Sequence, residues 1–175
     1  MRAARRALAH PEAAGEAAAR FPIERLAPVV AVYAPQGGEM DPGPLARRLA
    51  AAGARIVLPV AVARDAPLIF RAADGAAFAP DAAGILAPGP EAAVLVPGLV
   101  VAPVLALDAR GGRLGQGGGY YDRTLAALRA GGRVFVVGLA FAGQEVDEVP
   151  TGPHDERLDA ILTEMGYRET GKSGA

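Results

Sequence analysis

The sequence predicts an α/β protein with a mostly parallel central sheet that helices cover on both faces. Short apolar segments rich in valine, leucine and alanine recur along the chain, as expected for strands that a parallel sheet buries on both faces. Several of them are separated by segments with helical spacing of apolar residues and a glycine at the end. Such alternation of strands and helices is typical of βαβ units. At 175 residues, the chain fits one domain.

Apolar segments predict strands at residues 29–34, 55–60, 68–71, 99–107 and 133–141. The fourth of these belongs to the longest apolar stretch, residues 92–107, which contains Pro97, Gly98 and Pro103. This stretch is shorter than the roughly 18–20 residues that a membrane-spanning helix needs. We therefore interpret it as a buried strand.

Helices are predicted from periodicity more than from propensity, because alanine is abundant in this chain and is a strong helix former. Leu45 and Leu49 lie four residues apart, and Gly53 follows where a helix is expected to stop. Pro11 interrupts the first helical segment. We expect helices at residues 2–20, 44–52 and 120–130, and a long surface loop at residues 72–90.

Composition and charge exclude several classes of protein. The chain has no cysteine, which rules out disulfide scaffolds and thiolate metal sites. A net charge of −1 and a pI of about 6.1 argue against a nucleic-acid-binding protein. The N-terminus lacks the apolar core of a secretory signal. We expect a cytoplasmic monomer or weak homodimer without membrane or nucleic-acid partners, with one domain at residues 1–169 and a disordered tail at residues 170–175.

A glycine-rich run at residues 113–122 is the strongest functional signal. It places Gly115, Gly117, Gly118 and Gly119 just before a predicted helix. Glycine loses the most chain entropy on folding, so such a cluster usually marks close approach of the backbone to a ligand. Free N–H groups at the start of a helix favour an anion such as phosphate. The same spacing also fits a flexible loop in a glycine-rich sequence.

Two charged residues of this run suit a phosphate and metal site. Arg113 can contact phosphate with two N–H groups, and Asp122 can supply an oxygen ligand to Mg²⁺. The run lacks the Gly-Lys-Ser/Thr ending of a Walker loop, and it lies too late in the chain for a dinucleotide fingerprint. The spacing supports phosphate binding without choosing a reaction. On spacing alone, the chain could equally be an unrelated α/β protein with a convergent phosphate loop.

The run Arg-Leu-Gly-Gln-Gly-Gly-Gly-Tyr-Tyr-Asp also resembles the signature of the 5-formyltetrahydrofolate cyclo-ligases, or methenyltetrahydrofolate synthetases. The similarity begins with the segment Leu-Ala-Leu-Asp at residues 105–108. Further segments follow in the order of the family: residues 38–41, 58–59, 138–141, 153–155, 158–159 and 162–164, together with Gln144. The resemblance covers residues 29–164.

The resemblance implies a Rossmann-like three-layer sandwich. It also implies ATP- and Mg²⁺-dependent conversion of 5-formyltetrahydrofolate to 5,10-methenyltetrahydrofolate, with phosphorylation of the formyl oxygen and release of ADP and phosphate. It assigns Asp122 and Asp155 to the metal, and it assigns Glu39, Gly117 and Gly118 to the folate. The implied ATP-binding residues are Arg113, Leu114, Gly115, Gln116, Gly117, Gly118, Gly119, Tyr120 and Tyr121. No nucleophile or general acid or base is assigned.

The N-terminal segment departs from the family pattern. Members usually begin with a Lys-x-x-x-Arg segment whose basic side chains reach the ATP phosphates, and this chain lacks it. Arg2 and Arg6 share one helix face and are candidates to replace it, although solvated surface charges are the simpler interpretation. A non-catalytic paralogue that binds ATP or folate is therefore the alternative function.

Overall fold

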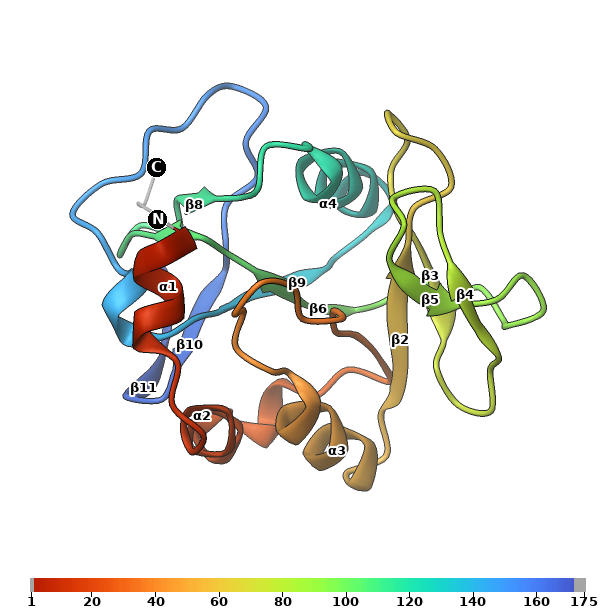
Figure 1. The fold of residues 1–175 in the computed structure, drawn as a ribbon, viewed down its shortest axis with the longest axis horizontal. Helices are drawn as coiled ribbons and strands as arrows, with labels where there is room; N and C mark the ends of the chain where they lie inside the picture. The colour runs from red at the N-terminus through yellow and green to blue at the C-terminus, as the bar shows by residue number, and fades with distance from the viewer. Residues whose placement is uncertain (1, 172–175) are drawn as a thin grey trace.

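The computed structural model describes residues 2–171, and its centre is a seven-stranded sheet (Figure 1). The strands are β1 (Val29–Ala31), β2 (Arg55–Val60), β3 (Ile69–Ala72), β6 (Leu99–Pro103), β9 (Phe135–Leu139), β10 (Ala160–Thr163) and β11 (Gly166–Glu169). Their order across the sheet is β11-β10-β9-β6-β1-β2-β3. The inner strands are parallel, and β3 and β11 are antiparallel edges. The predicted mostly parallel sheet is confirmed.

Helices cover both faces of the sheet and complete a three-layer sandwich. The helices are α1 (Arg2–Leu8), α2 (Ala13–Arg20), α3 (Gly43–Ala51) and α4 (Tyr120–Gly131). α2 and α3 lie along one face, and α4 lies on the other (Figure 1). Leu45 and Leu49 of α3 are buried in the core of the first face, and Leu125 of α4 is buried in the core of the second. The predicted apolar spacing thus marks the packed side of α3.

The segment of residues 2–20 forms two helices. α1 and α2 are separated by a turn at residues 9–12 that contains Pro11. A proline removes a helical hydrogen bond and clashes with the preceding turn, so the interruption falls where the sequence predicts it. α1 packs beside the short 3-10 helix η2 (Ala142–Gln144), where Leu8 lies against Gly143.

The prediction of a loop at residues 72–90 was wrong in part. The segment contains an antiparallel hairpin of β4 (Phe78–Pro80) and β5 (Leu86–Pro88). The carboxylate of Asp81 holds the hairpin in place, because it accepts the N–H of Ala61 after β2 and two N–H groups of the hairpin turn. Each of these strands is only three residues long and ends in a proline, so they are too short to show alternation in the sequence.

The predicted strand at residues 99–107 is split. β6 ends at Pro103, which has no N–H for a further ladder bond. The chain then turns, and β7 (Ala106–Leu107) pairs antiparallel with β8 (Arg113–Leu114). This second hairpin leads the glycine-rich run to the same cavity as the end of β6.

The C-terminal part of the described chain adds two strands that the sequence analysis did not predict. β10 is fully buried beside β9, and β11 pairs with β10 at the edge of the sheet. Thr170, expected in a disordered tail, donates its hydroxyl to the carbonyl of Leu158 at 2.6 Å and its N–H to the carbonyl of Asp159 at 2.9 Å. Residues 172–175 of the expected tail lie outside the described residues.

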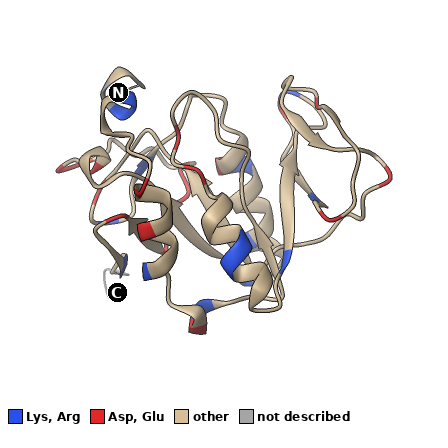
Figure 2. Ribbon diagram, turned by 60° about the horizontal axis from the view of Figure 1, so that its bottom comes forward, with Lys and Arg blue, Asp and Glu red and all other residues tan. Residues whose placement is uncertain are grey.

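Charged residues of both signs are spread over the molecule. Figure 2 shows Arg near Asp and Glu on helices and loops alike. This distribution follows the near balance of 18 basic and 19 acidic residues in the sequence. Each helix among residues 2–171 is too short or too polar to span a lipid bilayer.

Candidate active site

A cavity of about 700 Å³ opens where the strand order of the sheet reverses. β1 lies between β2 and β6, and the chain leaves β1 toward α3 on one face but leaves β6 toward α4 on the other. Crevices of this kind, at the carboxyl ends of parallel strands, are where α/β proteins bind ligands. Residues that follow β1, β2 and β6, the β4–β5 hairpin and the glycine-rich run all line the cavity.

Every residue predicted for the site lies in the lining of this cavity. They are Glu39, Arg113, Leu114, Gly115, Gln116, Gly117, Gly118, Gly119, Tyr120, Tyr121, Asp122 and Asp155. These residues belong to three separate parts of the chain, so the fold itself brings them together. Which ligand each of them contacts stays a prediction.

The glycine-rich run forms the loop from β8 into α4. Gly117 and Gly119 have φ angles of 93° and 64°, a region that other residues adopt only with strain. Gly119 is the N-cap of α4 and has no side chain to satisfy the first N–H groups of the helix. The helix dipole adds partial positive charge at the same place. Because the cavity lies at this end of α4, the loop can hold a phosphate group.

Arg113 and Asp122 form an ion pair at the start of α4. Nη2 of Arg113 donates to Oδ1 of Asp122, and its Nε donates to the carbonyl of Glu156 at 3.0 Å. The N–H of Glu156 donates to the same Oδ1 at 3.1 Å. The side chain of Arg113 is 4% exposed, whereas that of Asp122 is 26% exposed and lines the cavity. Oδ1 of Asp122 is therefore engaged with the protein.

Asp155 lines the same cavity from a neighbouring loop. Its Oδ2 accepts the N–H of Gly152 at 2.6 Å, which closes a turn over residues 152–155. The next residue, Glu156, contacts Asp122, so this loop adjoins the start of α4. Among the described residues, no three His, Asp or Glu side chains form a metal site by themselves. Two carboxylates nevertheless suit Mg²⁺, which keeps several waters and takes further oxygens from substrate phosphates.

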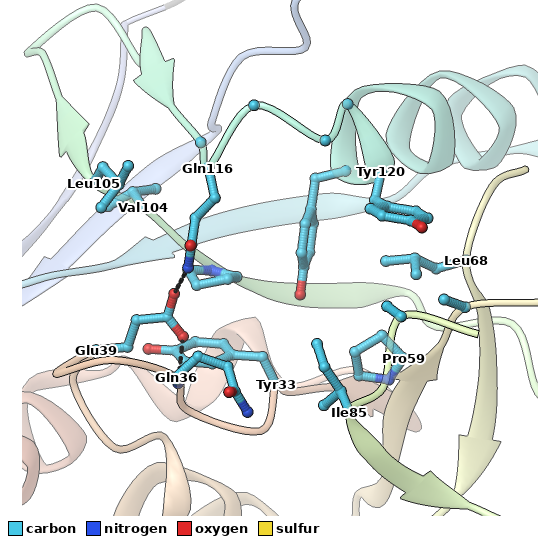
Figure 3. A pocket seen from close by; sticks show the side chains of 18 of the residues that line it. Tyr33, Gln36, Glu39, Pro59, Leu68, Ile85, Val104, Leu105, Gln116 and Tyr120 are labelled. Atoms are coloured by element: carbon cyan, nitrogen blue, oxygen red, sulfur yellow. Dashed lines mark hydrogen bonds between the residues drawn. The ribbon is translucent and has the colours of Figure 1, made fainter. Parts of the chain in front are cut away.

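Glu39 stands at one end of the cavity and joins three parts of the chain (Figure 3). Its Oε1 accepts hydrogen bonds from Arg5 of α1 at 3.3 Å and from Nε2 of Gln116 at 2.9 Å. Its Oε2 accepts the N–H of Gln36 at 2.9 Å. The side chain is only 4% exposed although it lines the cavity. The orientation of this carboxylate is therefore determined by donors from α1, the loop after β1 and the glycine-rich run.

Apolar side chains line the opposite end of the cavity. Figure 3 shows Pro59 of β2, Leu68 just before β3, and Ile85 of the β4–β5 hairpin at the end away from Glu39. The N–H of Leu68 donates to Oγ1 of Thr124 at 2.8 Å, which ties this wall to α4. An apolar wall facing a few fixed polar groups is the usual arrangement of a site for an organic ligand.

Two tyrosines of the cavity keep their protons at neutral pH. Burial raises the pKa of Tyr33 and of Tyr121 well above the ordinary value, and the charge of Glu39 raises each pKa further. Tyr33 belongs both to the core and to the cavity wall: it is 4% exposed, lines the cavity and donates its hydroxyl to the carbonyl of Met40 at 2.6 Å. Tyr121 can therefore offer a ligand a neutral phenol.

The contact between Arg5 and Glu39 was not predicted from the sequence. Arg6 is exposed, packs over Gly38 and is not among the residues that line the cavity, and the side chain of Arg2 lies outside the described part of the chain. Arg5 precedes Leu8 by three residues on α1, and Leu8 packs against the core. Residues three apart share a helix face, so the position of Leu8 was the available signal that Arg5 points inward.

Comparison with known proteins identifies relatives along most of the chain. The 5-formyltetrahydrofolate cyclo-ligase family model matches residues 1–164. The 5-formyltetrahydrofolate cyclo-ligase of Mycolicibacterium smegmatis is 33% identical over 77% of this chain and 72% of its own length. That of Escherichia coli is 32% identical over 82% of this chain and 81% of its own length. The NMR structure of Aquifex aeolicus 5,10-methenyltetrahydrofolate synthetase matches with a TM-score of 0.73 at 26% identity, covering 98% of this chain and 84% of that one.

Proposed function

Because this chain belongs to the 5-formyltetrahydrofolate cyclo-ligase family, we propose that it uses ATP and Mg²⁺ to convert 5-formyltetrahydrofolate to 5,10-methenyltetrahydrofolate, with release of ADP and phosphate. The enzyme class, a cyclo-ligase acting on folate, follows from the family itself. The observation that supports the fuller proposal is the single cavity shared by Glu39, the glycine-rich run and Asp122.

The two ends of the cavity suit the two substrates. The glycine-rich run offers backbone N–H groups at the start of α4, with Arg113 and Asp122 beside it, and these suit a triphosphate with its metal. The end of the cavity with the Glu39 carboxylate, away from the apolar wall, suits a pterin, which has N–H donors on a flat ring system. Glu39 and Gln116 lie in hydrogen-bond contact, so the folate end adjoins the ATP end.

The proposed chemistry explains why ATP is consumed. A formamide oxygen is a poor leaving group, and phosphorylation makes it a good one. The formyl oxygen attacks the γ-phosphorus, the bond from that phosphorus to the β–γ bridging oxygen breaks, and ADP leaves. N10 then attacks the activated formyl carbon. The bond between this carbon and the phosphate oxygen breaks, phosphate departs with the former formyl oxygen, and N10 loses its proton as the methenyl bridge closes.

Such a reaction depends on positioning and on charge stabilisation more than on a nucleophilic side chain. The loop of residues 115–119 would hold the phosphates in line with the formyl oxygen. Arg113 places a positive charge beside this loop, and the neutral phenol of Tyr121 can donate a hydrogen bond without adding negative charge. This division of roles agrees with the absence of an assigned nucleophile in the sequence analysis.

Asp122 and Asp155 are the residues that would hold Mg²⁺. Asp122 fits the ion because Arg113 and the N–H of Glu156 both bind Oδ1 and so hold the carboxylate in one orientation. When bound, Mg²⁺ would neutralise negative charge on the transferred phosphoryl group.

The test is to incubate the purified chain with ATP, Mg²⁺ and 5-formyltetrahydrofolate and to measure methenyl product and ADP in the same samples. Equal amounts of the two products are expected, and each should depend on both substrates and on Mg²⁺. ADP formation that is independent of folate, or no product at all, would contradict the proposal. Calorimetric binding of both substrates without turnover would identify the chain as the non-catalytic paralogue.

A further inference from the structure

We propose that Arg5 is a positioning residue for the folate end of the cavity. The proposal rests on the proposed function, because Arg5 would act through Glu39. Arg5 belongs to α1, its side chain is 2% exposed, and it is not among the residues that line the cavity. A role in the reaction would therefore come from the groups that its guanidinium holds in place.

The guanidinium of Arg5 ties three parts of the fold together. Nη1 donates to Oε1 of Glu39 at 3.3 Å and to the carbonyl of Val104, after β6, at 3.4 Å. Nη2 donates to the carbonyls of Gln36 and Gly37 at 3.1 and 3.0 Å. Of these partners, Glu39, Gln36 and Val104 line the cavity. One side chain of α1 thus sets the position of much of the folate end.

The loop after β1 is shaped around this guanidinium. Gly37 and Gly38 have φ angles of 53° and 85°, and this left-handed backbone is open to glycine at little steric cost. The carbonyls of Gln36 and Gly37 and the carboxylate of Glu39 all converge on Arg5. Without Arg5, the carbonyls of Gln36 and Gly37 would lose this donor. Glu39 would keep the hydrogen bonds from the N–H of Gln36 and from Gln116 but lose its charged partner, so its orientation would be less well defined.

Stability alone is a poor explanation for this arrangement. Among the described residues, Nε of Arg5 is buried without a hydrogen-bond partner, which carries a free-energy cost. A buried ion pair contributes little net stability compared with apolar packing. An arginine with an unsatisfied N–H at this place is better explained by a requirement on the orientation of Glu39.

The test compares the steady-state kinetics of the wild type with those of Arg5→Gln and Arg5→Lys. Arg5→Gln removes the charge and is expected to raise KM for 5-formyltetrahydrofolate by roughly tenfold, the size expected for loss of a charge-assisted hydrogen bond, with KM for ATP changed less than about twofold. Arg5→Lys keeps the charge but not the planar fork, so it should recover part of the loss.

A double variant shows whether Arg5 acts through Glu39. Adding Arg5→Gln to Glu39→Gln should raise KM for folate by less than about twofold, because residues that act as a unit have non-additive effects. Arg48→Gln is the matched control. Arg48 also donates to two backbone carbonyls, those of Ala18 and Phe21, which do not line the cavity. Its loss should lower Tm and leave both KM values unchanged.

Equal increases in the two KM values, or a full Arg5→Gln effect in the Glu39→Gln background, would overturn the proposal. If Arg5→Gln does not fold, the two KM values of Arg5→Lys are compared with those of Arg48→Gln. A rise in KM for folate alone supports the proposal, and equal rises in both KM values overturn it. Calorimetry with 5-formyltetrahydrofolate alone separates the two possible failures. Wild-type binding without turnover counts against the proposed function, whereas an unchanged Kd in Arg5→Gln counts against the role of Arg5.

Discussion

Arg113 and Asp122 form an ion pair across the glycine-rich run, so the two charged ends of this segment lie in direct contact. The pair brackets the loop and brings its first residue next to the first turn of α4. Because the N–H of Glu156 shares Oδ1 of Asp122, the carboxylate has one preferred orientation. A metal-binding role for Asp122 can therefore be tested without large changes in the loop.

Asp122→Asn is expected to lower Mg²⁺-dependent kcat/KM by roughly 100-fold or more, because the amide cannot supply a charged oxygen to the ion. The amide oxygen can still accept from Arg113, so the protein should stay folded. The measurement is ADP and methenyl product against Mg²⁺ concentration. Asp147→Asn, a change at an exposed position, is the control and should behave like the wild type. Wild-type activity of Asp122→Asn at all Mg²⁺ concentrations would refute the assignment.

Gly119→Ala is expected to weaken ATP binding and to lower the free energy of unfolding by about 1 kcal/mol, because a Cβ is strained at a φ of 64°. The new methyl group would also meet Nη1 of Arg123, which donates through Nη2 to the carbonyl of Gly118. Urea denaturation and KM for ATP measure the two effects. Gly131→Ala, at the other end of α4, is the control: its Cβ meets no atom within 4 Å, and it should leave KM unchanged.

The parts of the site that could be predicted from the sequence are those whose evidence is local. The glycine-rich run and Asp122 lie within ten residues, and their local pattern favours a ligand-binding loop at the start of a helix. The same holds for α3, where Leu45 and Leu49 repeat at helical spacing and are both buried. Local patterns of this kind predict the structure correctly because they depend only on one element and on the face by which it packs.

The parts that could not be predicted depend on contacts between distant residues. Arg5 contacts the carbonyl of Val104, 99 residues away, and periodicity within α1 shows only which face it occupies. The β4–β5 hairpin likewise depends on the bond from Ala61 to Asp81, 20 residues apart. No sequence pattern identifies the acceptors Val104 and Asp81, because any acceptor at the right place in the fold could make the same hydrogen bond.

Asp108 should stabilise the β7–β8 hairpin in a pH-dependent way. Its side chain is buried, and burial alone would raise its pKa, but hydrogen bonds from the N–H groups of Val149, Gly112 and Arg110 outweigh this effect and lower the pKa below the ordinary value. A lowered pKa in the folded state means that the stabilisation is present above about pH 4 and is lost as the pH falls further.

Asp108→Asn is accordingly expected to lower the free energy of unfolding by about 2 kcal/mol at neutral pH, because the amide replaces a charged acceptor. The difference from the wild type should shrink in acid. Urea denaturation at neutral and acidic pH measures both values. Asp65→Asn, at an exposed position, controls for the change in net charge. A difference of equal size at both pH values would show that the ionised carboxylate is not the source of the stabilisation.

Tyr121 is expected to make the fold sensitive to alkaline pH. Burial, and then the charge of Glu39, raises the pKa of Tyr121 in the folded state, while Arg113 opposes this shift. In the unfolded chain the phenol loses its proton near pH 10. The unfolded state is therefore favoured increasingly above about pH 10, and the stability falls as the pH rises toward the folded-state pKa.

Tyr121→Phe removes this titrating proton, so it no longer contributes to the pH dependence of the free energy of unfolding. Its free energy of unfolding should fall less steeply with pH above about pH 10 than that of the wild type, by up to about 1.4 kcal/mol per pH unit. Urea denaturation at several alkaline pH values measures the slope. Val137→Ala is the control, because it removes buried apolar volume but no titrating group and should lower the whole curve without changing its slope. Equal slopes for Tyr121→Phe and the wild type would mean that Tyr121 already loses its proton in the folded protein near pH 10.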